Sequence, residues 1–221
     1  MNIEQARFNM VEQQIRTWEV LDQDVLDLLY VVRREDFVPP AYRGLAFSDM
    51  EIPLGDKPAD GERMWQPKME ARVLQALAVR KTDHVLEVGT GSGYLTALLA
   101  NRAHRVVSVE INPALKNLGE ANLRRQMVTN ATLELGDAAR GWERHGPYDV
   151  IVLTGSTPVL PAELIAQLKP GGRLFAVVGD APVMSARLLT CQSSGACEST
   201  DLFETCLPAL QNAAQPERFR F

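Results

Sequence analysis

Short apolar runs alternate with helical patterns along most of the chain from residue 84 onward. Runs typical of buried strands cover residues 84–89, 105–110, 131–135, 148–153 and 172–178. Between them, apolar positions recur every three or four residues, which predicts helices over residues 93–102, 113–126 and 161–168. This alternation predicts an α/β fold with a doubly wound, mostly parallel sheet. A ligand site is then expected at the carboxyl ends of the strands.

The two ends of the chain depart from this alternation. Near the N-terminus, Phe8, Val11, Ile15 and Trp18 recur at helical spacing, and a second apolar helix follows Asp22 as its cap. The charged residues 33–36 are expected to be solvated, and residues 43–66 have no periodicity, which predicts a long loop. Residues 186–207 predict two further strands in an edge hairpin.

The same pattern indicates how the chain is organised. We expect a single domain in which residues 1–66 form N-terminal helices and a substrate-side loop. These would pack on an α/β core formed by residues 67–221.

Composition narrows the class of protein. The chain has 221 residues, a net charge of −5 and a pI near 5.3, so a broad basic surface for nucleic acid is not expected. No apolar run is long enough for a membrane span, and a cytoplasmic location with a monomeric or dimeric state is expected. Three cysteines without a secretory signal predict no disulfide framework, and the histidines show no metal-ligand spacing.

A glycine-rich turn follows the first predicted strand. Gly89, Gly91 and Gly93 occupy alternate positions between that strand and the next helix. The spacing matches neither a phosphate-binding loop nor a dinucleotide fingerprint, and by itself it could be only a tight turn. Glu110 ends the next strand about 20 residues after Gly89, the position from which an acid binds ribose hydroxyls. The combination predicts a site for a nucleoside cofactor.

Three acids near the turn indicate the charge of that cofactor. Glu87 lies in the first strand, Glu110 ends the second, and Asp137 follows the third. Three carboxylates would repel a pyrophosphate and favour a cationic nucleoside such as S-adenosylmethionine. Taken singly, Glu87 could be a strand residue in a polar contact, and Asp137 could be a turn former.

These features together resemble the protein-L-isoaspartate (D-aspartate) O-methyltransferase family. The resemblance covers most of the chain and is carried by residues 32–39, 42–49, 52–55 (Ile-Pro-Leu-Gly), 85–94, 136–137 and 167–172. It implies a seven-stranded Rossmann-like methyltransferase fold with a variant strand order at the C-terminal edge. It also implies methylation of isoaspartyl carboxylates in damaged proteins, with S-adenosylmethionine as cofactor and S-adenosylhomocysteine as product.

The resemblance also implies roles for particular residues. The three glycines would hold the methionine part of the cofactor, Glu110 the ribose and Asp137 the adenine. The full set implied to bind the cofactor is Glu87, Gly89, Thr90, Gly91, Ser92, Gly93, Glu110, Ile111, Gly136, Asp137 and Ala138.

One segment departs from the family pattern. Where the family reads Gly-Gln-Thr-Ile-Ser-x-Pro, residues 61–67 read Gly-Glu-Arg-Met-Trp-Gln-Pro, so Trp65 stands at the position of the active-site serine. An indole fills more space than a hydroxyl and only donates a hydrogen bond. Arg63 could hold an acceptor carboxylate bidentately in its place, or could be a surface charge paired with Glu62 or Asp60. We take Trp65 and Arg63 as the candidate catalytic residues.

Three functions fit this sequence. The first is repair-type methylation of isoaspartyl residues in proteins or peptides. The second is methylation of a small acidic or aromatic acceptor selected by Trp65 and Arg63, and the third is cofactor binding without transfer. A carboxylate acceptor is already ionised at neutral pH, so the lack of a histidine base does not argue against catalysis.

Overall fold

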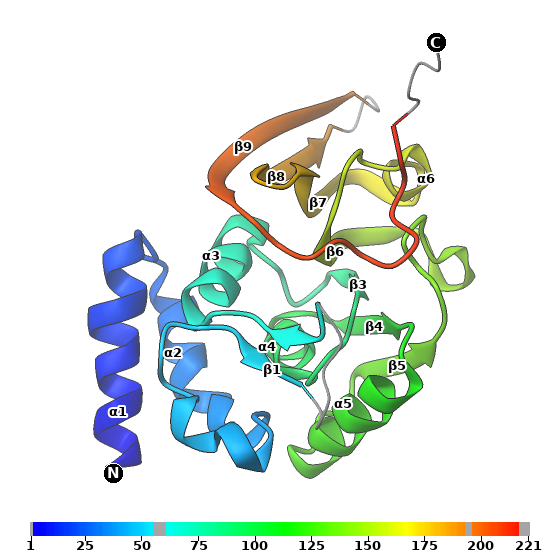
Figure 1. The fold of residues 1–221 in the computed structure, drawn as a ribbon. Coiled ribbons are helices and arrows are strands. Elements are labelled where there is room, and N and C mark those ends of the chain that lie inside the picture. The colour runs from blue at the N-terminus through cyan, green and yellow to red at the C-terminus, as the bar shows by residue number, and fades with distance from the viewer. Residues whose placement is uncertain (1, 55–60, 193–195, 217–221) are drawn as a thin grey trace.

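The fold is built on a twisted sheet whose first five strands are parallel (Figure 1). The computed structural model describes residues 2–54, 61–192 and 196–216. Within those ranges the large sheet has seven strands in the order β5-β4-β3-β6-β7-β8-β9. The strands are β3 (His84–Val88), β4 (Arg105–Glu110), β5 (Ala131–Leu135), β6 (Tyr148–Thr157), β7 (Leu168–Asp180), β8 (Val183–Cys191) and β9 (Cys197–Thr205). The prediction of a doubly wound, mostly parallel α/β sheet is confirmed.

Alternate strand residues feed two separate cores on the two faces of the sheet. Val85 and Val150 point into the core that contains α3 (Pro67–Leu77), α4 (Tyr94–Arg102) and α5 (Pro113–Arg125). Leu86 and Ile151 point into the opposite core, which α6 (Ala162–Ala166) covers. None of the helices in the described ranges is both long and apolar enough to cross a membrane.

The N-terminal helices join the first of these cores. The first helical segment runs as α1 (Ile3–Asn9), a π-helical stretch (Met10–Ile15) and a 3₁₀ turn (Arg16–Trp18), and it lies outside α2 (Gln23–Val31) and α3 (Figure 1). The predicted buried face was wrong in part, because Phe8 and Trp18 are about half exposed. A π-helical stretch adds residues to a turn and so rotates the side chains that follow it. Asp22 caps α2 as predicted.

The prediction that the charged residues 33–36 are solvated holds for the exposed Arg33 and was wrong for Arg34 and Glu35. Arg34 is 1% exposed and Glu35 is buried in the 3₁₀ turn Arg34–Asp36. Arg34 pairs with Glu70 of α3, and Glu35 pairs with Arg7 of α1. Charged side chains are buried only when paired, and these partners lie far away in the sequence. The 3₁₀ turn Pro40–Leu45 follows.

The predicted long loop contains a small antiparallel pair of strands, β1 (Ile52–Pro53) and β2 (Arg63–Met64). The connection between them, including Gly55 and Asp60, lies outside the described residues. After the loop, α3 begins at Pro67.

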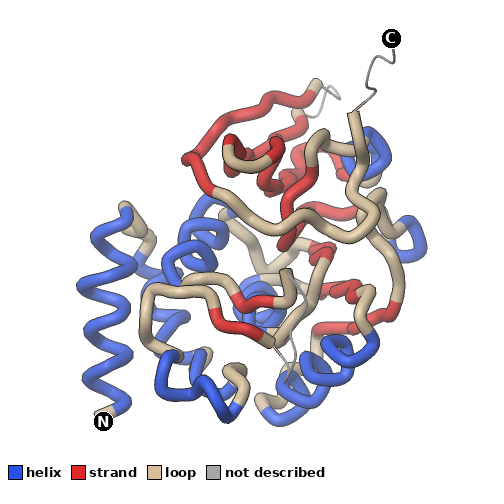
Figure 2. The backbone as a smooth tube through the Cα atoms, viewed as in Figure 1, coloured by secondary structure: helices blue, strands red, loops and turns tan. Residues whose placement is uncertain are grey.

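Near the C-terminus, β7 starts earlier than predicted. It begins at Leu168, which pairs with Tyr148, so the last residue of the predicted helix belongs to the strand. β8 and β9 form the predicted edge hairpin, and Cys191 and Cys197 lie opposite each other in its register. They form a disulfide, which corrects the prediction of no disulfide. Local cysteine counting could not foresee a pairing that depends on strand register. The segment after β9 then crosses the molecule as an extended loop (Figure 2).

Candidate functional site

The glycine turn between β3 and α4 adopts the backbone that its sequence predicted. Gly89, Gly91 and Gly93 have φ values of 96°, 54° and 81°, a region in which residues with a Cβ are strained. A Cβ on Gly89 would lie 2.1 Å from Thr154 Oγ1 of β6. Glycine at this position therefore lets β6 approach the turn.

Glu110 is fixed by the backbone of two turns. Its Oε2 accepts a hydrogen bond from Gly91 N at 2.9 Å, and its Oε1 accepts one from Asn112 N at 3.0 Å. Each carboxylate oxygen can accept a second hydrogen bond. The geometry leaves Glu110 preorganised to accept hydrogen bonds from a pair of hydroxyls.

Asp137 is held from two sides as well. Its Oδ1 accepts from Ala139 N at 3.0 Å, and its Oδ2 accepts from Asn212 Nδ2 at 2.8 Å. Asn212 belongs to the segment after β9, and no sequence motif marked it. The acid therefore does more than form a local turn, because it also anchors the C-terminal segment.

Glu87 lies beneath the turn rather than on an open rim. It is fully buried, and its Oε2 accepts hydrogen bonds from Thr96 and Ser108. Its Oε1 has no hydrogen-bond partner among the described residues. Burial raises the pKa of Glu87 to about 8, although the two hydroxyls oppose the shift. The carboxyl group is therefore largely protonated at pH 7.

This raised pKa predicts that binding of S-adenosylmethionine releases a proton. The cofactor carries a net positive charge, which favours the ionised carboxylate and lowers its pKa. Affinity should rise between about pH 6 and pH 8, by at most about tenfold per pH unit. Without ligand, the stability of the protein should change with pH in the opposite direction. The folded state keeps the proton on Glu87, whereas the unfolded chain releases it above the ordinary pKa of a glutamate. The free energy of unfolding should therefore fall as pH rises toward 8.

Calorimetry in buffers of different ionisation enthalpy measures the released proton. S-adenosylhomocysteine, which lacks the sulfonium charge, is the matched control ligand, and its binding should release fewer protons. Glu70 also lines the cavity, and burial raises its pKa while Arg34 beside it opposes the shift, so Glu87→Gln is needed to isolate the source. Unchanged proton release in Glu87→Gln would contradict the assignment.

The glycine turn, Glu110 and Asp137 line one cavity, and Trp65 forms a wall of it. Its side chain is buried, and its Nε1 donates to Thr154 O at 3.0 Å. The indole packs edge-on against Phe175 of β7, with ring centroids 6.3 Å apart. Its backbone carbonyl accepts a hydrogen bond from the buried Arg34. The family's serine position therefore presents an aromatic surface whose N–H is already used.

The neighbouring loop residues take different positions. Arg63 is exposed on β2 at the edge of the cavity. Glu62 Oε1 instead accepts a hydrogen bond from Asn112 Nδ2, which joins the loop to the turn after β4. Sequence reasoning singled out Arg63 and gave Glu62 only as its possible partner, because nothing local shows which side chain points inward.

The segment after β9 supplies a further wall that the sequence did not predict. Ser156 N donates to Pro208 O at 2.9 Å, and Leu210 N donates to Ser156 O at 2.9 Å. This pairing lays residues 208–211 along the end of β6, where they line the cavity. No motif in the segment could have indicated this role.

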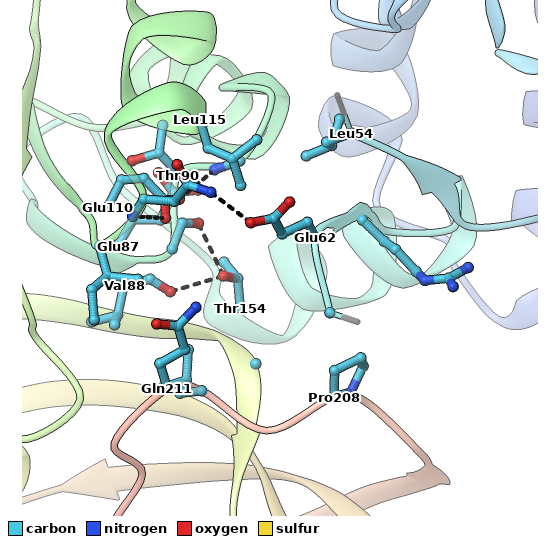
Figure 3. A pocket seen from close by; sticks show the side chains of 18 of the residues that line it. Leu54, Glu62, Glu87, Val88, Thr90, Glu110, Leu115, Thr154, Pro208 and Gln211 are labelled. Atoms are coloured by element: carbon cyan, nitrogen blue, oxygen red, sulfur yellow. Dashed lines mark hydrogen bonds between the residues drawn. The ribbon is translucent and has the colours of Figure 1, made fainter. Parts of the chain in front are cut away.

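Figure 3 shows how these walls face one another, with Glu110 and Thr90 opposite Leu54 and Glu62, and Pro208 on a third side. The predicted cofactor residues that line the cavity are Glu87, Gly89, Thr90, Gly91, Ser92, Glu110, Ile111, Gly136, Asp137 and Ala138, and Trp65 and Arg63 line it too. Gly93 is not among the lining residues; a Cβ there would lie 3.1 Å from Gly119 O of α5.

The chemistry of this cavity fits a cationic nucleoside. Two fixed carboxylates stand at the ends of the neighbouring strands β4 and β5. Under the glycine turn after β3 lies Glu87 Oε1, which has no hydrogen-bond partner among the described residues. The glycine turn leaves room for close approach, which a side chain would fill. The family resemblance implies that Glu110 binds the ribose and Asp137 the adenine of S-adenosylmethionine, which stays a prediction.

Comparisons with known proteins place the chain among similar sequences and folds. The family model described as protein-L-isoaspartate(D-aspartate) O-methyltransferase matches residues 5–207. The chain is 42% identical over 173 residues to a protein-L-isoaspartate O-methyltransferase of Methanoculleus marisnigri, covering 78% of this chain and 77% of the relative. It is 38% identical over 180 residues to one from Syntrophobacter fumaroxidans, covering 81% and 82%.

Solved structures agree on the fold. A protein-L-isoaspartate O-methyltransferase superposes with a TM-score of 0.76 at 23% identity, covering 94% of this chain and 65% of that one, so the chain spans slightly less than two thirds of its length. One from Plasmodium falciparum, in complex with S-adenosyl-L-homocysteine, superposes with a TM-score of 0.74 at 20% identity, covering 91% and 96%. On the family match and the two relatives, the chain belongs to the protein-L-isoaspartate (D-aspartate) O-methyltransferase family.

Proposed function

We propose that this protein transfers a methyl group from S-adenosylmethionine to the carboxylate of isoaspartyl residues in damaged proteins. It is an S-adenosylmethionine-dependent O-methyltransferase by family. The observation that carries the proposed acceptor is the family match over residues 5–207. Trp65, which forms a wall of the cofactor cavity at the family's serine position, marks the acceptor side. We place the acceptor beside this wall.

The chemistry asks little of the protein beyond alignment. The bound cofactor supplies an electrophilic methyl group on a sulfonium. The acceptor carboxylate is ionised at neutral pH, so no general base is needed. Holding the two reactants in line can contribute about 7–11 kcal/mol. Glu110 and Asp137 would hold the cofactor, and the buried wall formed by Trp65 and Leu207 would exclude water from the reacting atoms.

The acceptor and the cofactor are assigned to different parts of the chain. We infer that residues 1–66 form the acceptor side, through Trp65, and that residues 67–221 form the cofactor side. Arg63, exposed at the edge, would meet the acceptor first rather than hold its carboxylate in the cavity. A cytoplasmic location, a monomeric or dimeric state and the absence of a nucleic-acid partner remain predictions from composition.

The proposal is tested by transfer of labelled methyl to a matched pair of peptides, one isoaspartyl and one with normal aspartate. We expect base-labile label on the isoaspartyl peptide alone, because an ester forms only at the correctly presented carboxylate. Calorimetric binding of S-adenosylmethionine is the control for an intact cofactor site. Binding without transfer to either peptide would refute the proposed acceptor.

A Trp65→Ser variant sharpens this test. The substitution restores the family's hydroxyl and leaves Glu110 and Asp137 in place, so the variant should still bind S-adenosylmethionine. Isoaspartyl transfer should be present in both proteins. Transfer that appears only in Trp65→Ser would mean that the parent's indole excludes the isoaspartyl acceptor.

A further inference from the structure

A second cavity lies on the other side of Trp65. It is formed between α3 and the segment that follows β9, and β9 ends close to α3 (Figure 1). It shares Glu51, Trp65 and Leu207 with the cofactor cavity, so the two spaces adjoin along one wall. No residue implied to bind the cofactor lines it.

The walls of this second cavity are mainly aromatic and apolar. Trp18, Trp65 and Phe203 contribute rings, and Met69 and Leu207 contribute buried aliphatic surface. The Trp18 side chain is 47% exposed, whereas a side chain as large as tryptophan is usually more deeply buried. The cavity therefore offers rings that an apolar group could cover.

The cations of this cavity are already engaged. The Lys68 ammonium lies 4.0 Å from the centroid of the Trp18 ring and 2.7 Å from an Asp49 carboxylate oxygen. The Arg72 guanidinium lies 4.2 Å from the centroid of the Phe203 ring. Glu51 and Glu204 also line the space, so its charges balance. The lining therefore selects for apolar surface rather than for one sign of charge.

The position of the cavity indicates what occupies it. In the proposed function the acceptor carboxylate meets the cofactor beside Trp65, and an extended polypeptide advances about 3.3–3.6 Å per residue. A residue one or two positions from the acceptor would therefore fall in the adjoining space. We propose that the second cavity binds an apolar or aromatic side chain of the acceptor polypeptide, next to its isoaspartyl residue. This inference rests on the proposed function.

Kinetics with isoaspartyl peptides that differ only in one flanking residue test the inference. The residue is phenylalanine, leucine, glycine or glutamate, placed on either side of the isoaspartate. We expect kcat/KM to be at least about tenfold higher with phenylalanine or leucine than with glycine or glutamate, through KM, because burial of the side chain stabilises the bound peptide. Equal values for all peptides on both sides would overturn the inference.

A Phe203→Ala variant separates binding from folding. It removes one wall, so the ratio of kcat/KM for the phenylalanine peptide to kcat/KM for the glycine peptide should fall at least threefold. Val183→Ala, a truncation of an exposed side chain on β8, is the matched control and should leave both values unchanged. An equal loss with both peptides in Phe203→Ala would count against a role in peptide selection.

Cys206 gives a second readout that does not require methyl transfer. It is exposed, lines this cavity and is the free cysteine, since Cys191 and Cys197 are joined. The phenylalanine peptide should slow its alkylation by a maleimide at least threefold, and the glycine peptide should not. Cys206→Ser is the control for labelling elsewhere.

The two readouts distinguish failure of the inference from failure of the proposed function. Protection of Cys206 without any methyl transfer would support the cavity as a peptide site and refute isoaspartyl transfer. Transfer that is insensitive to the flanking residue, with no protection, would refute the cavity and leave the proposed function standing.

Discussion

Replacing Arg34 with methionine is expected to lower the free energy of unfolding by about 3–5 kcal/mol. The Arg34 side chain is fully buried and donates to Glu70, to Ala46 O at 3.0 Å and to Trp65 O. Methionine fills similar space but donates nothing, so three buried acceptors lose their partner at about 1–3 kcal/mol each, partly offset by relaxation. Urea denaturation of the parent and the variant measures the loss, provided that the free energy of unfolding falls with the same slope against urea concentration in both proteins.

The neighbouring arginine is the matched control. Arg33 is exposed, so Arg33→Met should change stability by no more than about 0.5 kcal/mol. Adding Glu70→Leu to Arg34→Met should recover part of the loss, because it removes the stranded carboxyl group. Similar effects of Arg33→Met and Arg34→Met would show that the buried contacts of Arg34 contribute little.

These two arginines illustrate where sequence reasoning stops. Both belong to one charged run, and such runs are usually solvated. The partners that bury Arg34 and Glu35 are Glu70 and Arg7, which lie 36 and 28 residues away. Only the tertiary packing of α1, α2 and α3 brings them together, so no local pattern marks which charge is buried.

The cofactor side was predictable for the opposite reason. Its strands, its glycine turn and Glu110 follow one another in sequence, and β4 and β5 begin and end at the predicted residues. Local chain geometry therefore positions them. The wall formed by residues 208–211 depends instead on pairing with Ser156, about 50 residues earlier, and could not be predicted from its own sequence.

The Gly89→Ala variant is expected to bind S-adenosylmethionine about 100-fold more weakly. Gly89 has a φ of 96°, and an added Cβ would lie 2.1 Å from Thr154 Oγ1. A strained residue of this kind costs about 1–3 kcal/mol. Without ligand the turn can relax away from the collision, and binding must then restore the strained geometry, so the cost appears in affinity. Calorimetric titration measures it directly.

Two further variants separate the collision from the backbone strain. Gly171 also has a positive φ, 80°, but nothing lies within 4 Å of a Cβ there, so Gly171→Ala should lower stability and leave cofactor affinity unchanged. Thr154→Ala in the Gly89→Ala background removes the colliding oxygen, so the double variant should bind S-adenosylmethionine at least a few-fold more tightly than Gly89→Ala. If Gly89→Ala binds like the parent, the carboxylates of Glu110 and Asp137, rather than the shape of the turn, determine affinity for the cofactor.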